Sequence, residues 1–188
     1  MDECWDGLTC RCTDEQGRLA AGAEDRRPGP VTKWNVWGRG VSATLFLKRH
    51  VIAHVGYFDE MLGLGACSEF QSGEETDYLL RALEKGMKLR YEPRMSVFHP
   101  LPIASRNAGA ISKSWYYGLG MGRVLAKHHY NLVQVYCFVA MPLLGALRAY
   151  CFGDRALARL RATRALARFQ GWRWRPQNST IVPPWPLT

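Results

Sequence analysis

The chain has 188 residues, 47% of them hydrophobic, so it is long enough and apolar enough to bury a core. Its 25 Lys and Arg residues outnumber its 16 Asp and Glu residues, which gives a formal net charge of +9. This composition excludes a wholly disordered chain, and the charge favours an anionic partner such as a phosphate group, a nucleic acid or an anionic membrane surface.

The cysteines and the first residues of the chain indicate a reducing compartment. No two of the six cysteines have the Cys-x-x-Cys spacing that would indicate a zinc knuckle or a redox dithiol. We therefore expect them to be free thiols, as in cytosolic proteins. The N-terminus lacks a basic stretch followed by an apolar run, so we expect no signal peptide.

Strand-like and helix-like segments alternate through the first half of the chain. The hydrophobic patterns predict strands over residues 7–18, 41–47, 88–91 and 95–99, the first of which ends in a polar turn. They predict helices over residues 50–55 and 78–86, which end at Gly56 and Gly86. Alternation of this kind favours an α/β fold.

The second half of the chain is predicted to be helical. The spacing Gly118-x-x-x-Gly122 fits close packing between helices better than a nucleotide-binding loop, because no strand precedes it. Residues 130–147 hold no charged side chain and reach about the ~18-residue length of a membrane span, although Pro142 weakens that interpretation. Residues 154–169 mix leucines with arginines, which fits either a helix in a lipid headgroup layer or a solvated basic helix.

Three carboxylates, Glu74, Glu75 and Asp77, stand at the start of the helix predicted around residues 78–86. A helix N-terminus carries partial positive charge and free N–H groups, so carboxylates there are held ionised and oriented, which suits a catalytic base. A structural explanation of Glu75 is also open, because Ser72 stands three residues before it, as in a capping box.

Two further residues near this cluster admit both structural and functional explanations. Arg81 follows Asp77 by four residues, so the two can form an ion pair along one face of the helix. His99 ends a predicted strand and is either a structural histidine or a ligand at the carboxyl end of the sheet, where α/β folds place ligands.

Four motifs occur in a distinctive order and spacing. They are Gly40-Val-Ser-Ala-Thr-Leu-Phe-Leu-Lys-Arg49, Val55-Gly-Tyr-Phe-Asp-Glu60, Gly73-Glu-Glu-Thr-Asp77 with Arg81 and Gly86, and Tyr91-Glu-Pro93 with His99. Together they resemble family 2 glycosyltransferases of the GT-A type, over about residues 7–170 and most specifically over residues 55–99. The segment 117–128 is similar to the membrane-associating C-terminal extension of bacterial members.

This resemblance implies a partial GT-A fold, an α/β mixed sheet followed by a helical membrane-associating extension. It implies that Glu75 removes the proton of the acceptor hydroxyl in an inverting displacement, with Glu74 and Asp77 beside it. A divalent metal, Mn or Mg, is expected on the donor diphosphate, with His99 among its ligands. Substrate-binding roles are expected for Asp59, Glu60, Arg81, and for Trp34 and Trp37 by stacking on a sugar ring.

The resemblance also implies three parts: an acceptor and catalytic half over residues 1–103, a helical extension over 104–175 and an irregular tail over 176–188. Members of the family begin with a nucleotide-binding half that carries an Asp-x-Asp metal motif, and this sequence has no Asp-x-Asp. We therefore expect a fragment, a truncated member or a degenerate member, with little activity by itself. Glutamate stands at position 75 where aspartate is more usual.

The expected partners are a nucleotide-sugar donor, a glycan or lipid-linked acceptor, and a membrane surface that contacts residues 130–170, at the cytoplasmic face of the inner membrane. No nucleic-acid partner is expected. Two alternatives stay open. The net charge and the arginine-rich helix also fit a non-catalytic basic adaptor for membranes or nucleic acids, and the absent donor half fits a pseudoenzyme that assembles with a complete transferase.

Overall fold

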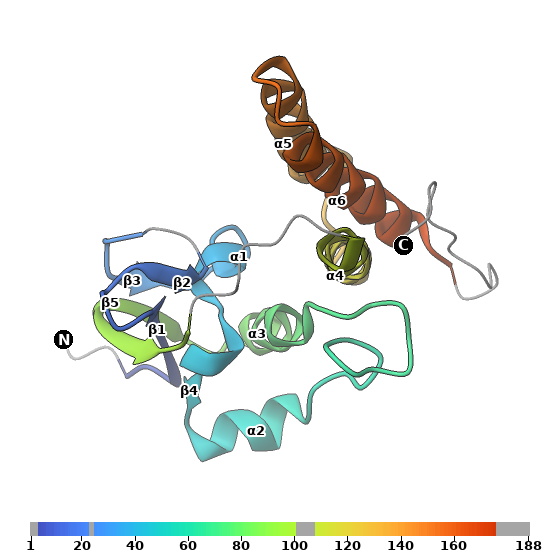
Figure 1. Cartoon of the computed structure of the whole chain (residues 1–188). Coiled ribbons are helices and arrows are strands. Elements are labelled where there is room, and N and C mark those ends of the chain that lie inside the picture. The colour runs from blue at the N-terminus through green and yellow to red at the C-terminus, as the bar shows by residue number, and fades with distance from the viewer. Residues whose placement is uncertain (1–3, 23–24, 101–107, 176–188) are drawn as a thin grey trace. The chain divides into compact units, whose positions relative to one another are not determined.

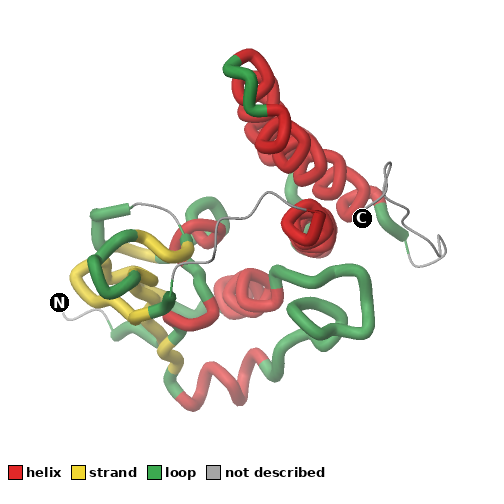
Figure 2. Tube along the Cα trace, viewed as in Figure 1, coloured by secondary structure: helices red, strands yellow, loops and turns green. Residues whose placement is uncertain are grey.

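The computed structural model describes residues 4–22, 25–100 and 108–175. The chain forms two compact units, unit 1 with residues 1–59 and 74–103, and unit 2 with residues 60–73 and 104–188. Unit 1 combines strands with short helices, and the regular structure of unit 2 is helical (Figure 2). The predicted α/β class is confirmed, and the predicted irregular tail lies outside the described residues.

The mixed sheet of unit 1 has five strands (Figure 1). They are β1 (Gly7–Thr13), β2 (Leu19–Ala21), β3 (Gly29–Pro30), β4 (Phe46–Leu47) and β5 (Leu89–Phe98). The strand order is β2-β1-β5-β3, and β4 also pairs with β1. Only the pair β1–β5 is parallel among the described strand pairs. Side chains of this central pair, including Cys10, Cys12, Leu89 and Tyr91, are buried in the core.

The two strands predicted on either side of Pro93 are one continuous strand, β5. The β1–β5 register shifts at this point, because Cys10 pairs with Glu92 whereas the next residue, Arg11, pairs with Ser96. The extra residues of β5 begin at Pro93, which has no N–H to give to the ladder. The proline therefore marks a bulge inside one strand rather than a boundary between two.

The helices of unit 1 are α1 (Val36–Arg39), the 3-10 turn η1 (Ser42–Thr44), α2 (Arg49–Val55) and α3 (Glu74–Glu84). As predicted, α2 ends at Gly56, whose φ of +85° strains any other residue. The strand predicted over 41–47 is largely wrong, since only Phe46 and Leu47 belong to β4. The N–H and the hydroxyl of Thr44 both donate to the oxygen of Val41, which closes a turn there instead.

Unit 2 contains α4 (Ala108–Lys127), α5 (Leu132–Cys151), α6 (Arg155–Arg173) and the loop 60–73. The helix α6 packs against both α4 and α5, and Figure 1 shows α5 and α6 side by side. A Cβ added at Gly118 would lie 2.6 Å from Ala167 Cβ, and one added at Gly122 would lie 2.1 Å from Arg168 O. The predicted role of these glycines in close helix packing is confirmed.

The helix α5 is long and apolar enough to cross a membrane, by length and composition alone. Its 20 residues correspond to about 30 Å at ~1.5 Å per residue, the thickness of a bilayer hydrocarbon core. A core helix of a soluble protein passes the same test, but such a helix is mostly buried, whereas only 17% of the apolar window of α5 is buried. Val133, Leu144 and Leu147 are among its exposed large side chains.

Candidate functional site

The predicted carboxylate cluster lies on the first turn of α3, which begins at Glu74. Gly73 precedes the helix with a φ of +94°, a conformation that suits glycine. Because the helix begins at Glu74, Glu75 is the second helical residue and Ser72 stands outside the N-cap position. The Ser72 hydroxyl donates instead to Tyr117 O, at 2.8 Å within unit 2. A capping box between Ser72 and Glu75 therefore does not explain Glu75.

Glu75 has a strongly shifted pKa. Burial, followed by the negative charge of Glu74, raises the pKa of Glu75 to about 7. A hydrogen bond between the two carboxyl side chains acts in the same direction, and one with the backbone N–H of Glu75 opposes it. Glu75 is nevertheless only half-buried. At neutral pH this carboxyl is therefore divided between its acid and base forms and still reaches the surface.

Glu74 contributes a second unusual group to the same turn. Its Oε2 is shielded from solvent and has no hydrogen-bond partner. A buried carboxylate oxygen without a donor is unfavourable unless a donor arrives or the group takes up a proton. The pair Glu74–Glu75 is thus a place where a hydroxyl or a proton would be stabilised.

Asp77 and Arg81 form a structural ion pair beside the cluster. Asp77 is fully buried, and its Oδ2 accepts a hydrogen bond from Arg81 Nε at 2.8 Å. Arg81 also donates to Val55 O at 3.0 Å and to Tyr57 O at 2.8 Å. These hydrogen bonds of Arg81 connect the end of α2 to α3. This geometry supports the ion-pair explanation of both residues over a direct role in chemistry or substrate binding.

The predicted sugar-stacking residues flank the start of α1. Trp34 is 67% exposed just before that helix, and Trp37 within it is half-buried. Asp59 is half-buried at the end of the first segment of unit 1, whereas Glu60 is exposed and belongs to unit 2. Among these residues, Trp34 alone offers a largely open aromatic face for a ligand.

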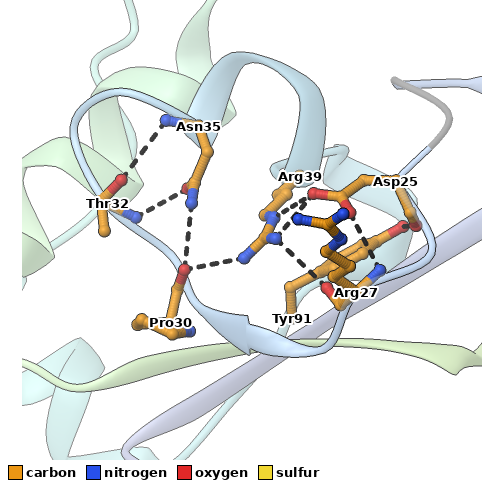
Figure 3. Close-up of polar contacts among 7 residues, drawn as sticks. All are labelled: Asp25, Arg27, Pro30, Thr32, Asn35, Arg39 and Tyr91. Atoms are coloured by element: carbon orange, nitrogen blue, oxygen red, sulfur yellow. Dashed lines mark hydrogen bonds and ion pairs between the residues drawn. The ribbon is translucent and has the colours of Figure 1, made fainter.

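A polar cluster that the sequence did not reveal fixes α1 in place (Figure 3). Arg39 donates to Asp25 Oδ2 at 2.8 Å and 2.6 Å, and also to the oxygens of Arg27 and Pro30. The guanidinium lies 5.0 Å from the centroid of the Tyr91 ring. Backbone and side-chain donors from Arg27 and Arg39 lower the pKa of Asp25. The loop that carries Trp34 is thereby anchored to the core of unit 1.

The same loop is closed by hydrogen bonds at its other end. Asn35 Oδ1 accepts from Thr32 N at 2.8 Å, and Asn35 Nδ2 donates to Pro30 O at 3.1 Å (Figure 3). These contacts hold the backbone on both sides of Trp34. The indole is therefore an exposed side chain on a fixed backbone, which is the arrangement that a stacking residue requires.

His99 follows β5 at the carboxyl end of the parallel pair β1–β5. Its N–H donates to Thr13 O at 2.8 Å, and its ring Nδ1 lies 2.8 Å from Pro100 O. The side chain is exposed. Within residues 4–22, 25–100 and 108–175, no group of three or more His, Cys, Asp and Glu residues could hold a metal ion. A divalent metal therefore lacks a ligand set here, and the predicted metal role of His99 stays a prediction.

Two hollows in unit 1 lie away from the carboxylate cluster. One, of about 560 Å³, is lined by residues that include Trp5, Leu8 and Lys48. The other, of about 390 Å³, is lined by residues that include Val31, Met87 and Arg90. Neither is lined by a predicted site residue. The carboxylate pair, unlike the residues that line either hollow, combines a carboxyl of raised pKa with an unpartnered polar atom, and it is therefore the stronger candidate site.

Comparison of the chain with protein-family models, with curated proteins and with solved structures gives no match.

Proposed function

We propose that the chain is the acceptor-binding and base-carrying part of a glycosyltransferase of GT-A type that uses a nucleotide-sugar donor. The observation that carries the proposal is the Glu74–Glu75 pair, whose geometry keeps the pKa of Glu75 near 7. A general base works best when its pKa is close to the operating pH, and paired carboxylates with separated pKa values are typical of catalytic sites. The motif order described above supplies the reaction class.

In the proposed step, a Glu75 carboxylate oxygen takes the proton of the acceptor hydroxyl. The acceptor oxygen then attacks the anomeric carbon of the donor sugar as the bond to the nucleoside diphosphate breaks, and the diphosphate leaves with that electron pair. Glu74 keeps Glu75 basic by electrostatic repulsion. Trp34 would stack on the acceptor sugar.

A divalent metal would neutralise the departing diphosphate in such a reaction. The described residues hold no group of three or more His, Cys, Asp and Glu residues that could bind this metal. His99 is the one residue of the chain that we propose as a metal ligand. The donor-binding acids would have to come from another segment or another polypeptide.

The test is release of nucleoside diphosphate from a panel of nucleotide sugars by the chain completed with a nucleotide-binding half, with a membrane lipid extract as acceptor. Glu75→Gln should lower acceptor-dependent release by about 100-fold or more, the range of a lost general base. Glu75→Asp should keep part of the rate. The wild-type rate should rise with pH through about 7, because only the ionised carboxylate accepts the proton. Undiminished release by Glu75→Gln would show that Glu75 is not the base.

We further propose that unit 2 attaches the protein to a membrane through α5. This second proposal is favoured by the exposure of Val133 and Leu144, at 72% and 67%, on a helix of membrane-spanning length. It is also compatible with the non-catalytic adaptor that the sequence left open. Flotation of the chain with phosphatidylcholine vesicles tests it. Val133→Asp with Leu144→Asp should abolish flotation, and retention of flotation would contradict the proposal.

A further inference from the structure

Three arginines of α6 form a row along one face of that helix. Arg161, Arg164 and Arg168 are spaced by three and four residues, so their side chains leave neighbouring turns in similar directions. Each donates a hydrogen bond to a neighbouring helix. The acceptors are, in order, Gly145 O of α5 at 2.9 Å, Ser114 Oγ of α4 at 3.3 Å and Phe138 O of α5 at 2.7 Å.

All of these acceptors are neutral, and no carboxylate in the described part of the chain pairs with the arginine row. Unit 2 as a whole holds 12 Lys and Arg residues but only 3 Asp and Glu residues. Unit 1 holds 13 of each kind, so the entire net charge of +9 resides in unit 2.

One N–H group of the arginine row also lacks a hydrogen-bond acceptor. Arg168 Nε is shielded from solvent and has no hydrogen-bond acceptor. Burial, and then the charge of Arg164, lower the pKa of Arg168 to about 10. Desolvation and the charge of Arg161 lower the pKa of Arg164 in the same way. The like charges along the row repel one another, which is a cost that a bound anion would remove.

Guanidinium groups recognise phosphate through paired N–H donors, and a row of three matches a phosphate monoester with its several oxygens. The row also adjoins an apolar surface. Arg161 and Arg168 bond to carbonyls of α5, and Met141 and Leu144, which lie between those carbonyls in the sequence, are 64% and 67% exposed. A ligand held here would have its charged end on α6 and an apolar part against α5.

We propose that Arg161, Arg164 and Arg168 form a binding site for the phosphate headgroup of a membrane lipid whose acyl chains lie against α5. This inference rests on the proposed attachment of α5 to the membrane. It assigns to unit 2 a specific ligand class, a lipid phosphate, beyond general attraction to an anionic surface. Such a site would hold α6 at the headgroup level.

The test compares flotation of the full chain with phosphatidylcholine vesicles that contain or lack phosphatidic acid. The variant Arg161→Gln with Arg164→Gln should weaken the phosphatidic-acid-dependent binding by about tenfold or more, because charge-assisted hydrogen bonds are lost. Arg155→Gln with Arg173→Gln is the matched control. It removes the same charge from positions of α6 outside the arginine row, and we expect a loss below about threefold. Circular dichroism of both variants checks that α6 is intact.

Equal losses in the two variants would overturn the site and leave only diffuse charge attraction. Absence of any gain from phosphatidic acid would overturn it as well. If inorganic phosphate binds the detergent-solubilised chain as tightly as the lipid does, the site takes free phosphate, and the lipid assignment is wrong. Failure of the proposed attachment through α5 has a separate signature, since the chain would then not float with phosphatidylcholine alone.

Discussion

Replacement of Glu75 by glutamine should stabilise unit 1 at alkaline pH, although it removes the proposed base. The pKa of Glu75 rises from the ordinary value of 4.5 to about 7 in the folded protein. A raised pKa means that the folded state binds a proton that the unfolded state has already lost. The favourable contribution of this group is therefore complete below pH 4.5 and is lost as the pH rises through about 7.

The magnitude follows from the interval between the two pKa values. At ~1.4 kcal/mol per pH unit, ionisation of Glu75 in the folded protein costs about 3 kcal/mol once the pH exceeds the folded pKa. Glutamine resembles the protonated acid in shape and carries no charge. We therefore expect Glu75→Gln to be more stable than the wild type by about 3 kcal/mol at pH 8 and to match it near pH 4.

Urea unfolding at a series of pH values, followed by hydrogen exchange of the β5 amides, measures this difference within unit 1. Glu15→Gln is the matched control. Glu15 lies exposed in the turn after β1, and its replacement should change stability by no more than about 0.5 kcal/mol at any pH. A stability difference for Glu75→Gln that is independent of pH, or a loss of stability at pH 8, would show that the folded protein does not raise the pKa of Glu75.

Three further predictions concern the neighbours of Glu75 and the helix packing of unit 2. Glu74→Gln should move the pKa of Glu75 back toward 4.5, because a negative charge beside it is removed. Carbon-13 NMR of the Glu75 carboxyl measures this shift, and an unchanged titration would show that the charge of Glu74 does not raise the pKa of Glu75. Asp77→Asn should lower the free energy of unfolding of unit 1, measured by urea unfolding, by about 3 kcal/mol, since Arg81 loses its buried partner. A change below about 1 kcal/mol would indicate that the ion pair is exposed to solvent. Gly122→Ala should lower the thermal midpoint of unit 2 markedly, because the new Cβ would lie 2.1 Å from a backbone oxygen of α6, and an unchanged midpoint would argue against this packing.

The sequence predicted correctly those features that depend on one residue or on residues a few positions apart. The end of α2 at Gly56 and the close packing at Gly118 and Gly122 depend on the absence of a side chain, which is visible in the sequence itself. The pairing of Asp77 with Arg81 likewise follows from their spacing on one helix. These features need no knowledge of the rest of the chain.

Features that depend on contacts distant in the sequence were not predictable. A proline such as Pro93 usually indicates the end of a strand. Only the register of β5 against β1 shows that the strand continues past Pro93 through a bulge. The anchor of the Trp34 loop joins Asp25 to Arg39 and Tyr91, residues that no sequence spacing relates. The perturbation of Glu75 depends on its burial, which its position after Gly73 does not reveal.

The expected stability cost at Glu75 bears directly on the choice between a structural and a catalytic role. If the side chain served only to begin α3, glutamine or a short polar residue would serve as well, without about 3 kcal/mol of ionisation cost at alkaline pH. Glu74 adds to that cost by its charge and leaves one of its own oxygens without a donor. Strain of this kind, stored in two adjacent carboxyl groups, is expected where a protein needs a carboxylate that readily accepts a proton. The pH dependence of the Glu75→Gln stability difference therefore tests the physical basis of the proposed chemistry even before a substrate is known.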